Sequence, residues 1–325
     1  MSQTDPSARE LDRLRVAVVG AGAIGGVLGA RLQQAGPDVV FIARGATLDA
    51  LRSRGLILES IDGDLTLPAV QATDDPHQVG VVDVVLVCVK ATQVERLAPS
   101  LRPLVGPATA VIPVQNGVEA SALLATALGE RNVLEGLGRV LVEQVVPGHI
   151  RHTAVTPIIE FGRRAGAPEQ SAAYAQIPRF AAALQSAGLV AHLPDDMGVA
   201  QWAKFLFIEP IGAVAAAARV PFGIVRSMLA SRAVIDAALH EVREVGRAVG
   251  VAWPPDVIDR VWGRYDSLPA DGSTSMQRDL MAGRPSEFEA QTGAVVRIGR
   301  DHGVPTPVHD VLYAVLLPTA QRAMT

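Results

Sequence analysis

An α/β domain with a doubly wound parallel sheet, followed by an all-α domain, is the fold class that this sequence predicts. Strand-like and helix-like stretches alternate through the first half of the 325 residues, as they do in successive βαβ units. Beyond residue 194 one helical pattern follows another. We therefore expect a disordered lead-in over residues 1–14, a sheet domain over residues 15–194 and a helical domain over residues 195–325.

Apolar runs predict the strands of the first domain. The runs assigned to single strands are Arg15–Val19, Asp38–Ala43, Asp83–Val89, Thr109–Val114 and Leu189–His192. Two short runs, Leu56–Glu59 and Leu65–Pro68, flank Asp62-Gly63 and predict a hairpin. The stretch from Val133 to Phe161 holds several short extended runs around the turn Pro147-Gly148.

Helical periodicity predicts helices in both domains. Those of the first domain are Ala23–Ala35, Gln93–Leu101, Ala120–Leu128 and Ser171–Ser186. Those of the second domain are Met197–Arg219, Ser231–Val249, Asp256–Tyr265, Ser286–Asp301 and Val308–Ala323.

The composition excludes several classes of protein. A net charge of −4 gives no basic surface for nucleic acid or an anionic membrane. The single cysteine, Cys88, excludes an intrachain disulfide, has no neighbours at zinc-ligand spacing and lies in an apolar run typical of buried side chains. No uncharged apolar run reaches the roughly 18 residues of a membrane span, and the first residues lack the apolar core of a signal peptide. We expect a soluble, cytoplasmic protein.

A glycine-rich loop follows the first predicted strand and opens the first predicted helix. Its residues Gly20, Ala21, Gly22, Ala23, Ile24 and Gly25 fit the pattern G-x-G-x-x-G. In this context the first glycine permits the tight turn, the second lets the backbone approach a pyrophosphate, and the third lets helix and strand pack closely. The pattern predicts a Rossmann-type dinucleotide site, and a plain strand-to-helix turn is the alternative.

Arg44 follows the second predicted strand, where an NAD-binding domain places an acid for the ribose hydroxyls. A guanidinium suits a 2′-phosphate instead, so the sequence favours NADP(H) as cofactor. The alternative is a solvated arginine at the start of a surface loop.

Two later strand ends also carry polar residues. Lys90 ends the apolar run Val84–Val89, and Asn116-Gly117 follows the run Thr109–Gln115. Because ligands of open α/β sheets bind beyond the carboxyl ends of the strands, both are candidates to contact cofactor or substrate. Asn-Gly is also a favoured turn pair, and a simple turn explains it equally well.

Lys204 is the strongest candidate for catalysis in the second domain. It is the one charged residue from Met197 to Ile208, and 27 of the 29 basic residues of this chain are Arg. A buried ammonium loses proton affinity and becomes a general acid near neutral pH, which a guanidinium cannot do. The alternative is a lysine whose ammonium snorkels to the helix surface.

Glu287 and Ser275 have structural explanations from the sequence alone. Glu287 is expected in the first turn of the helix Ser286–Asp301, where the helix dipole favours an acid. Ser275 is a candidate N-cap.

The order of these motifs resembles that of the ketopantoate reductase (2-dehydropantoate 2-reductase) family over nearly the whole chain. The matching residues are the Gly20 loop, Arg44, Val89-Lys90-Ala91, Asn116-Gly117, Trp202, Lys204, Ser275-Met276 and Glu287. The resemblance implies a step of pantothenate biosynthesis, in which NADPH reduces a 2-oxo acid to a 2-hydroxy acid. It implies that the glycine loop and Arg44 bind the cofactor phosphates, and that Lys90 and Asn116 line its nicotinamide side. It further implies that Lys204 is the general acid, and that Glu287 and Ser275, with Asn116, hold the substrate.

One departure concerns substrate recognition. The family pattern has Asn four and eight residues after the catalytic lysine, whereas this chain has Ile208 and Gly212. An apolar wall at Ile208 and space at Gly212 would suit a bulkier 2-oxo acid. We therefore expect ketopantoate or another branched or aromatic 2-oxo acid as substrate, with a non-catalytic NADP(H) sensor as a different class of function. A small-molecule substrate and a homodimer are the partners expected.

Overall fold

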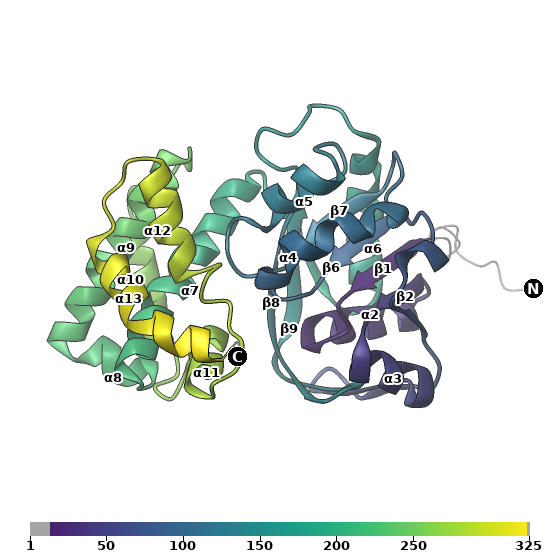
Figure 1. Ribbon diagram of the computed structural model, residues 1–325, viewed down its shortest axis with the longest axis horizontal. Coiled ribbons are helices and arrows are strands. Elements are labelled where there is room, and N and C mark those ends of the chain that lie inside the picture. Colours follow the sequence, from purple (N-terminus) through teal and green to yellow (C-terminus); the bar gives the residue numbers. More distant parts are fainter. Residues whose placement is uncertain (1–13, 324–325) are drawn as a thin grey trace, which may run out of the picture. The chain divides into compact units, whose positions relative to one another are not determined.

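The computed structural model describes residues 14–323, and its helices and strands carry the labels of Figure 1. The disorder expected of residues 1–13 lies outside the described residues. Leu14, which we assigned to the lead-in, is 1% exposed, and its carbonyl accepts a hydrogen bond from the amide of Asp38 (3.0 Å). That assignment was wrong by one residue, because the core begins at Leu14.

The chain packs into two compact units. The sheet unit holds the chain up to Gln115 together with Ala120–Met197, and the helical unit holds Asn116–Glu119 together with Gly198–Thr325. The short segment 116–119 therefore packs with the helical unit, although the sequence around it belongs to the sheet unit.

One sheet of the sheet unit is parallel throughout. Its strands, in spatial order, are β5 (Gln71–Thr73), β2 (Asp38–Ile42), β1 (Arg15–Val19), β6 (Val84–Val87) and β7 (Ala110–Pro113). The chain reverses direction across the sheet after β2 and β5, so that β1 and β6 lie side by side. This topology confirms the doubly wound Rossmann-type prediction, and it makes the carboxyl ends of β1 and β6 the switch point where such sheets bind ligands.

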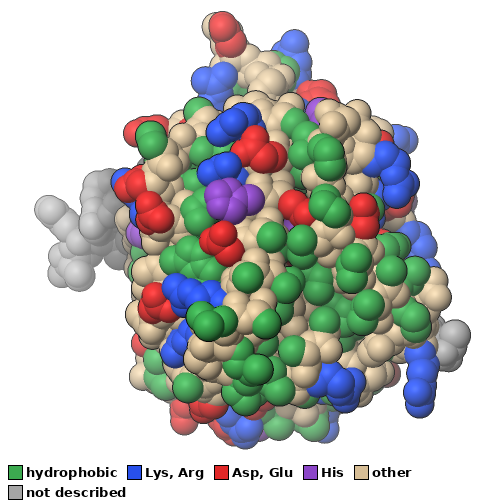
Figure 2. Space-filling model, turned by 90° about the vertical axis from the view of Figure 1, so that its left-hand side faces the viewer, with side chains coloured by type: hydrophobic (Ala, Val, Ile, Leu, Met, Phe, Trp, Pro, Cys, Tyr) green, Lys and Arg blue, Asp and Glu red, His purple; other side chains and the backbone are tan. Residues whose placement is uncertain are grey.

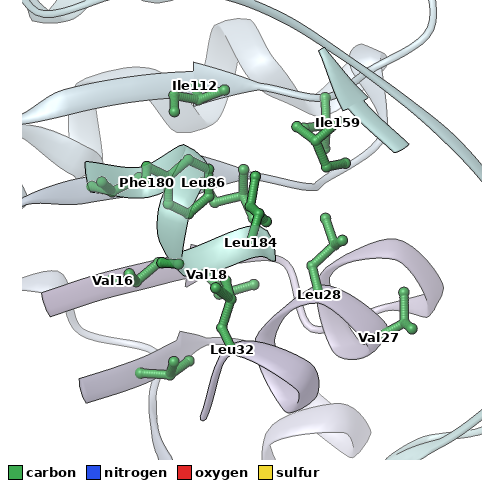
Figure 3. Close-up of a cluster of buried hydrophobic side chains, with 14 of the residues drawn as sticks. Val16, Val18, Val27, Leu28, Leu32, Leu86, Ile112, Ile159, Phe180 and Leu184 are labelled. Atoms are coloured by element: carbon green, nitrogen blue, oxygen red, sulfur yellow. The ribbon is translucent and has the colours of Figure 1, made fainter. Parts of the chain in front are cut away.

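Both faces of the parallel sheet are buried, because its strands are apolar at successive positions. Val16 and Val18 pack into one core together with Leu28 and Leu32 of α2 (Ala23–Ala35), as Figure 3 shows. Ala17 and Val19 pack into a separate core on the opposite face. The remaining helical elements of this unit are α3 (Gly45–Arg54), η1 (Pro76–Gln78), α4 (Ala91–Leu97), η2 (Ala98–Leu104), α5 (Ala120–Leu128), η3 (Ala172–Ala175) and α6 (Gln176–Ser186).

Two differences from the predicted helices have local causes. The predicted helix Gln93–Leu101 is α4 followed by the 3-10 segment η2, because Pro99 and Pro103 lack the amide protons that an α-helix needs. The helix α3 and the strand β5 were missed, since neither has a clear apolar face.

A second, mixed sheet was not predicted as a separate layer. Its path is β10 (Val190–His192), β9 (His149–Gly162), β3 (Leu56–Ser60) and β4 (Leu65–Leu67), and β8 (Glu135–Val146) pairs with β9. The hairpin of β3 and β4 confirms the prediction at Asp62-Gly63. The extended runs of Val133–Phe161 are mostly two long strands, joined at the predicted turn Pro147-Gly148.

The helical unit is built around α7 (Met197–Ala218), with α8 (Phe222–Ser227), α9 (Leu229–Ala248), α10 (Val257–Ser267), α11 (Ser275–Met281), α12 (Thr292–Asp301) and α13 (Pro307–Arg322). Among the described helices, α7 alone is long and apolar enough to cross a membrane, but 72% of its most apolar window is buried within the protein. That burial is typical of a core helix.

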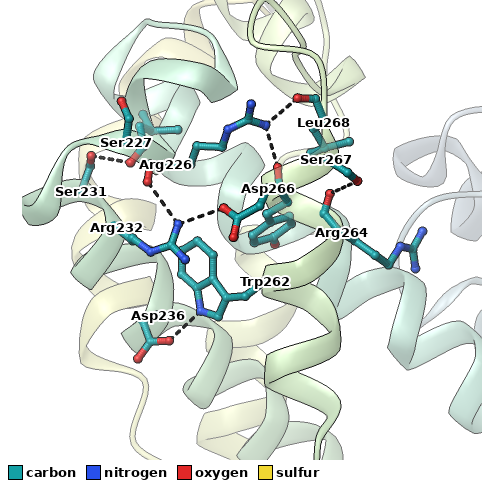
Figure 4. Close-up of polar contacts among 12 residues, drawn as sticks. Arg226, Ser227, Ser231, Arg232, Asp236, Trp262, Arg264, Asp266, Ser267 and Leu268 are labelled. Atoms are coloured by element: carbon teal, nitrogen blue, oxygen red, sulfur yellow. Dashed lines mark hydrogen bonds and ion pairs between the residues drawn. The ribbon is translucent and has the colours of Figure 1, made fainter.

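Cation–aromatic and polar contacts join α8, α9 and α10. The guanidinium of Arg232 lies 3.8 Å from the centre of the Trp262 ring and donates to Asp266 (3.1 Å), as Figure 4 shows. Arg226 donates to the carbonyls of Tyr265 and Leu268, each at 2.6 Å. These contacts satisfy the carbonyls at the end of α10.

Figure 2 shows hydrophobic side chains gathered between charged ones on one face of the molecule. Among the described residues of the helical unit, the large hydrophobic side chains that remain exposed are Ile224, Met228, Leu229, Val234, Val249, Met281, Val311 and Val315.

Candidate functional site

The glycine loop connects β1 to α2 at the switch point of the parallel sheet. Gly20 has φ +94°, and a Cβ there would lie 2.8 Å from Val89 Cγ1. A Cβ at Gly25 would collide with the carbonyl oxygen of Gly20 and lie 3.0 Å from Cys88 Cβ. The two glycines are therefore required by the backbone and by the close approach of α2 to the sheet.

Gly22 differs from Gly20 and Gly25 because a Cβ there would meet no atom closer than 3.9 Å. It is the N-cap of α2, and the one heavy atom within 4 Å of a Cβ built there is Gln144 Oε1, at 3.9 Å. The first amides of α2 therefore start at a position where a Cβ would make no close contact. A helix N-terminus with this clearance fits an anionic group such as a phosphate.

Arg44 lies at the carboxyl end of β2, next to the glycine loop. The amide of Gly20 donates to the carbonyl of Ile42 (2.9 Å), which places the two strand ends side by side. Arg44 is exposed and N-caps α3 through its backbone. Within residues 14–323, its side chain makes no hydrogen bond, ion pair or ring contact, so its guanidinium is available for an anion.

Lys90 and Cys88 follow β6. Lys90 is exposed and is the N-cap residue of α4. Gln115, which sequence reasoning missed, donates from Nε2 to the carbonyls of Val87 (2.9 Å) and Val89 (2.8 Å) and so holds this strand end. Burial raises the pKa of the Cys88 thiol, which suits the expected role as an apolar side chain and not a nucleophile.

Asn116 and Glu287 meet in the helical unit. Asn116 Nδ2 donates to Glu287 Oε2 at 3.0 Å. Gly117 has φ +103°, and a Cβ there would lie 2.6 Å from the carbonyl oxygen of Ala290. Gln201, one helical turn before Lys204, donates to the carbonyl of Gly117 (3.3 Å). The Asn-Gly pair is therefore a tightly docked turn that presents its amide to a carboxylate.

The position of Glu287 differs from the prediction. The helix predicted from Ser286 begins at Thr292, and residues 286–291 form an irregular turn. Phe288 is 1% exposed and stacks on Tyr313 of α13, with ring centres 5.2 Å apart. Because α12 begins only at Thr292, Glu287 is not a first-turn acid, and its role there is not to balance a helix dipole.

Lys204 is 7% exposed on α7. Of the two alternatives that the sequence left open, the one in which its ammonium snorkels to solvent is therefore excluded. Its neighbours Phe205 and Leu206 are fully buried. Trp202 packs edge-on against Phe205, with ring centres 5.5 Å apart. Lys204 is therefore a buried lysine in an apolar stretch of α7.

Ser275 and Gly212 require two corrections. Ser275 is the first residue of α11, and the N-cap is Thr274, whose Oγ1 accepts from the amide of Gln277 (3.1 Å). The space expected at Gly212 is filled by the same threonine, since a Cβ built there would lie 2.9 Å from Thr274 Oγ1 and Cγ2. Ser275 itself is exposed, and Ile208 is half-buried.

The fold and the strand-end residues define a dinucleotide-dependent oxidoreductase. Family models described as "Ketopantoate reductase PanE/ApbA" and its C-terminal domain match residues 16–166 and 196–319. The chain belongs to the ketopantoate reductase family, whose members are pyridine-nucleotide-dependent reductases.

Relatives and solved structures agree with this assignment. A 2-dehydropantoate 2-reductase of Mesorhizobium japonicum is 30% identical, over 93% of this chain and 97% of its own. The crystal structure of a ketopantoate reductase from Ralstonia eutropha superposes with a TM-score of 0.84 at 30% identity, covering 96% of this chain and all of its own. A D-mandelate dehydrogenase with NADH and anilino(oxo)acetate has the same TM-score at 20% identity, covering 96% and 100%, and shares the fold.

Proposed function

We propose that this protein reduces a 2-oxo acid to the 2-hydroxy acid with NADPH, and that ketopantoate is its first candidate substrate. The observation that carries the proposal is Lys204, a lysine 7% exposed on an apolar core helix, in a chain that otherwise uses arginine almost throughout. Arrival of a hydride at a ketone leaves an alkoxide that needs a proton, and a poorly hydrated ammonium donates one readily.

The glycine loop and Arg44 would hold NADP(H). The amides at the start of α2, beside Gly22, suit the pyrophosphate, and the guanidinium of Arg44 suits a 2′-phosphate. When bound, the nicotinamide supplies the hydride. Lys90, at the end of β6, and Asn116 would contact the nicotinamide side of the cofactor.

Lys204, Glu287, Ser275 and Asn116 would act on the substrate. Lys204 donates the proton to the carbonyl oxygen that becomes the hydroxyl. Glu287, held by Asn116, accepts a hydrogen bond from a substrate hydroxyl, and Ser275, exposed at the start of α11, donates to the carboxylate. Charge-assisted bonds of this kind orient the oxo carbon for hydride transfer.

The residues around Lys204 weaken polar selectivity for ketopantoate. Ile208 and Gly212 each lack a hydrogen bond that the family pattern supplies, worth on the order of 1 kcal/mol. Because Thr274 fills the space at Gly212, the substrate contact at this helix face would come from Ile208 alone. A branched or aromatic 2-oxo acid is therefore the second candidate substrate.

The test is NADPH oxidation by the purified protein with ketopantoate, 2-oxoisovalerate and phenylglyoxylate, repeated with NADH. The proposal expects turnover with at least one acid and a preference for NADPH. Cofactor binding without turnover of any 2-oxo acid would support a non-catalytic NADP(H) sensor instead.

Localisation and assembly belong to the same proposal. A biosynthetic reductase of a small acid works in the cytoplasm, without nucleic acid or a membrane as partner. A homodimer is expected. The molar mass from light scattering during size-exclusion chromatography distinguishes it from a monomer.

A further inference from the structure

A buried histidine links two carboxylates inside the helical unit. His309, near the start of α13, is 0% exposed. Its Nε2 lies 2.7 Å from Glu209 Oε2, and its Nδ1 lies 2.6 Å from Glu241 Oε2. Glu209 is on α7 and is also 0% exposed, and Glu241 is on α9. We call these three residues the buried charge cluster.

The histidine of the cluster carries a proton at neutral pH. Burial disfavours the charge, but Glu209 and Glu241 outweigh it and raise the pKa of His309 to about 9. Both ring nitrogens then donate, one to each carboxylate. The amides of Val308 and His309 also donate to Glu241, at 2.7 and 3.0 Å, so each carboxylate has defined partners.

The cluster is connected to the turn that carries Glu287. Thr292 Oγ1 donates to Glu209 Oε1 at 2.8 Å, and Thr292 is 0% exposed. Thr292 is the first residue of α12 and directly follows the turn 286–291. The buried charge cluster therefore ties that turn to α7 at Glu209, five residues after Lys204.

Besides Glu287, which is bonded to Asn116, three residues of the turn carry polar side chains. Ser286 Oγ and the side-chain amide of Gln291 are buried without hydrogen-bond partners among the described residues. Glu289 accepts from Tyr313 (3.0 Å) and Arg297 (3.2 Å), but its side chain is 46% exposed. The fully buried polar contact at the end of the turn is the one between Thr292 and Glu209.

A stabilising role alone explains the cluster poorly. Removing charges from water costs free energy, and the attraction between the charges often does no more than balance that cost. Well-packed apolar side chains would therefore stabilise the packing of α7, α9, α12 and α13 equally well. What the charges add is a fixed geometry, because every carboxylate oxygen of Glu209 and Glu241 has at least one donor at hydrogen-bond distance.

We propose that Glu209, His309 and Glu241 are positioning residues, which act through Thr292 to fix the Glu287 turn relative to the helix of Lys204. The proposal rests on the function proposed above, in which Glu287 holds a substrate hydroxyl. Loosening the turn misplaces the carboxylate of Glu287 while leaving Lys204 and the cofactor-binding residues in place.

Two variants test the positioning role on the full-length protein. Thr292→Val removes one hydroxyl at constant volume, and Glu209→Gln removes one charge. Both should raise KM for the 2-oxo acid about tenfold, with kcat within about threefold and the Kd of NADPH unchanged. The matched controls are Thr126→Val, at an exposed position, and Glu244→Gln, at a half-buried one, both outside the cluster, and they should behave as the wild type.

A double-mutant cycle separates positioning from general stability. If Thr292 acts through Glu287, Thr292→Val should have little further effect on KM in a Glu287→Gln background. Full additivity of the two changes in KM, or a KM within twofold of wild type in both single variants, overturns the proposal.

Hydrogen exchange distinguishes failure of this inference from failure of the proposed function. The amides of residues 286–292 should exchange at least tenfold faster in Thr292→Val than in the wild type and in Thr126→Val. If the wild type turns over no 2-oxo acid but this exchange difference appears, the function fails and the anchoring of the turn stands. Equal exchange in all three proteins overturns the anchoring.

Discussion

Asn116 Nδ2 and Glu287 Oε2 lie 3.0 Å apart, although 171 residues separate them in the chain. The segment of Asn116 leaves the last strand of the parallel sheet and packs with the helical unit, where Gly117 docks against Ala290. Both residues belong to the helical unit and form one hydrogen-bonded pair, which we propose to be part of the substrate site.

Changing Asn116 tests this pair. Asn116→Asp places a carboxylate opposite that of Glu287, and the repulsion should lower kcat/KM for the 2-oxo acid more than Asn116→Ala does. We expect losses of roughly tenfold for alanine and a hundredfold for aspartate. Steady-state kinetics at pH 7.5 measure both, and an aspartate variant as active as the wild type would argue against a role for the pair.

Arg44 is expected to determine the choice of cofactor. Its guanidinium is exposed, lies next to the glycine loop and has no partner among the described residues. Arg44→Ala should raise KM for NADPH by about 10- to 100-fold, the range of a lost charge-assisted hydrogen bond, and leave KM for NADH nearly unchanged. Equal effects on both cofactors would remove the basis for assigning NADP(H).

The surroundings of α7 predict opposite outcomes for the two residues that replace the family's Asn pair. Ile208 is half-buried, so Ile208→Asn should fold and raise kcat/KM for ketopantoate relative to 2-oxoisovalerate by about tenfold. Gly212→Asn should lower the thermal midpoint instead, because its Cβ would lie 2.9 Å from Thr274. Calorimetry and competition kinetics test the two outcomes, and a stable Gly212→Asn protein would contradict the packing described for Thr274.

The buried charge cluster predicts how stability depends on pH. The pKa of His309 is raised from 6.5 to about 9 in the folded protein, so its contribution is complete below pH 6.5 and is lost as pH rises towards 9. The lowered pKa of Glu241 acts in the opposite direction, and its contribution is lost in acid. Glu209, Glu241 and the amides of Val308 and His309 face this histidine, and Tyr265 lies beside Glu209.

Urea unfolding at pH 6, 7.5 and 9 measures that dependence. The free energy of unfolding should fall between pH 6.5 and 9 by roughly 1.4 kcal/mol for each unit of the His309 shift. His309→Gln should be less stable at pH 6 and should lose this slope, whereas the exposed His302→Gln should keep it. An unchanged slope in His309→Gln would show that another group titrates.

The sheet unit was predicted well because its signals are local. The β-branched run of β1, the glycine pattern and the apolar face of α2 are each encoded within about 20 residues, and all have the predicted bounds. The second sheet was not predicted, because pairing β3 with β9 depends on contacts about 90 residues apart.

The candidate site in the helical unit was predicted less completely. Residue types indicated Lys204, but the loss of space at Gly212 depends on where Thr274, the N-cap of α11, packs. The buried charge cluster has no pattern in sequence, because Glu209, Glu241 and His309 come from three helices. Their one sequence signal is Glu209 itself, the one acid on α7, next to Pro210.

The central claim is that Lys204 donates the proton in an NADPH-dependent reduction. Its most direct test is kcat of Lys204→Ala and Lys204→Arg with the best 2-oxo acid, measured with the Kd of NADPH for each variant. We predict that both variants bind NADPH as the wild type does and lose at least about a hundredfold in kcat, since neither side chain can donate a proton near neutral pH. A kcat within threefold of wild type in either variant would contradict the claim.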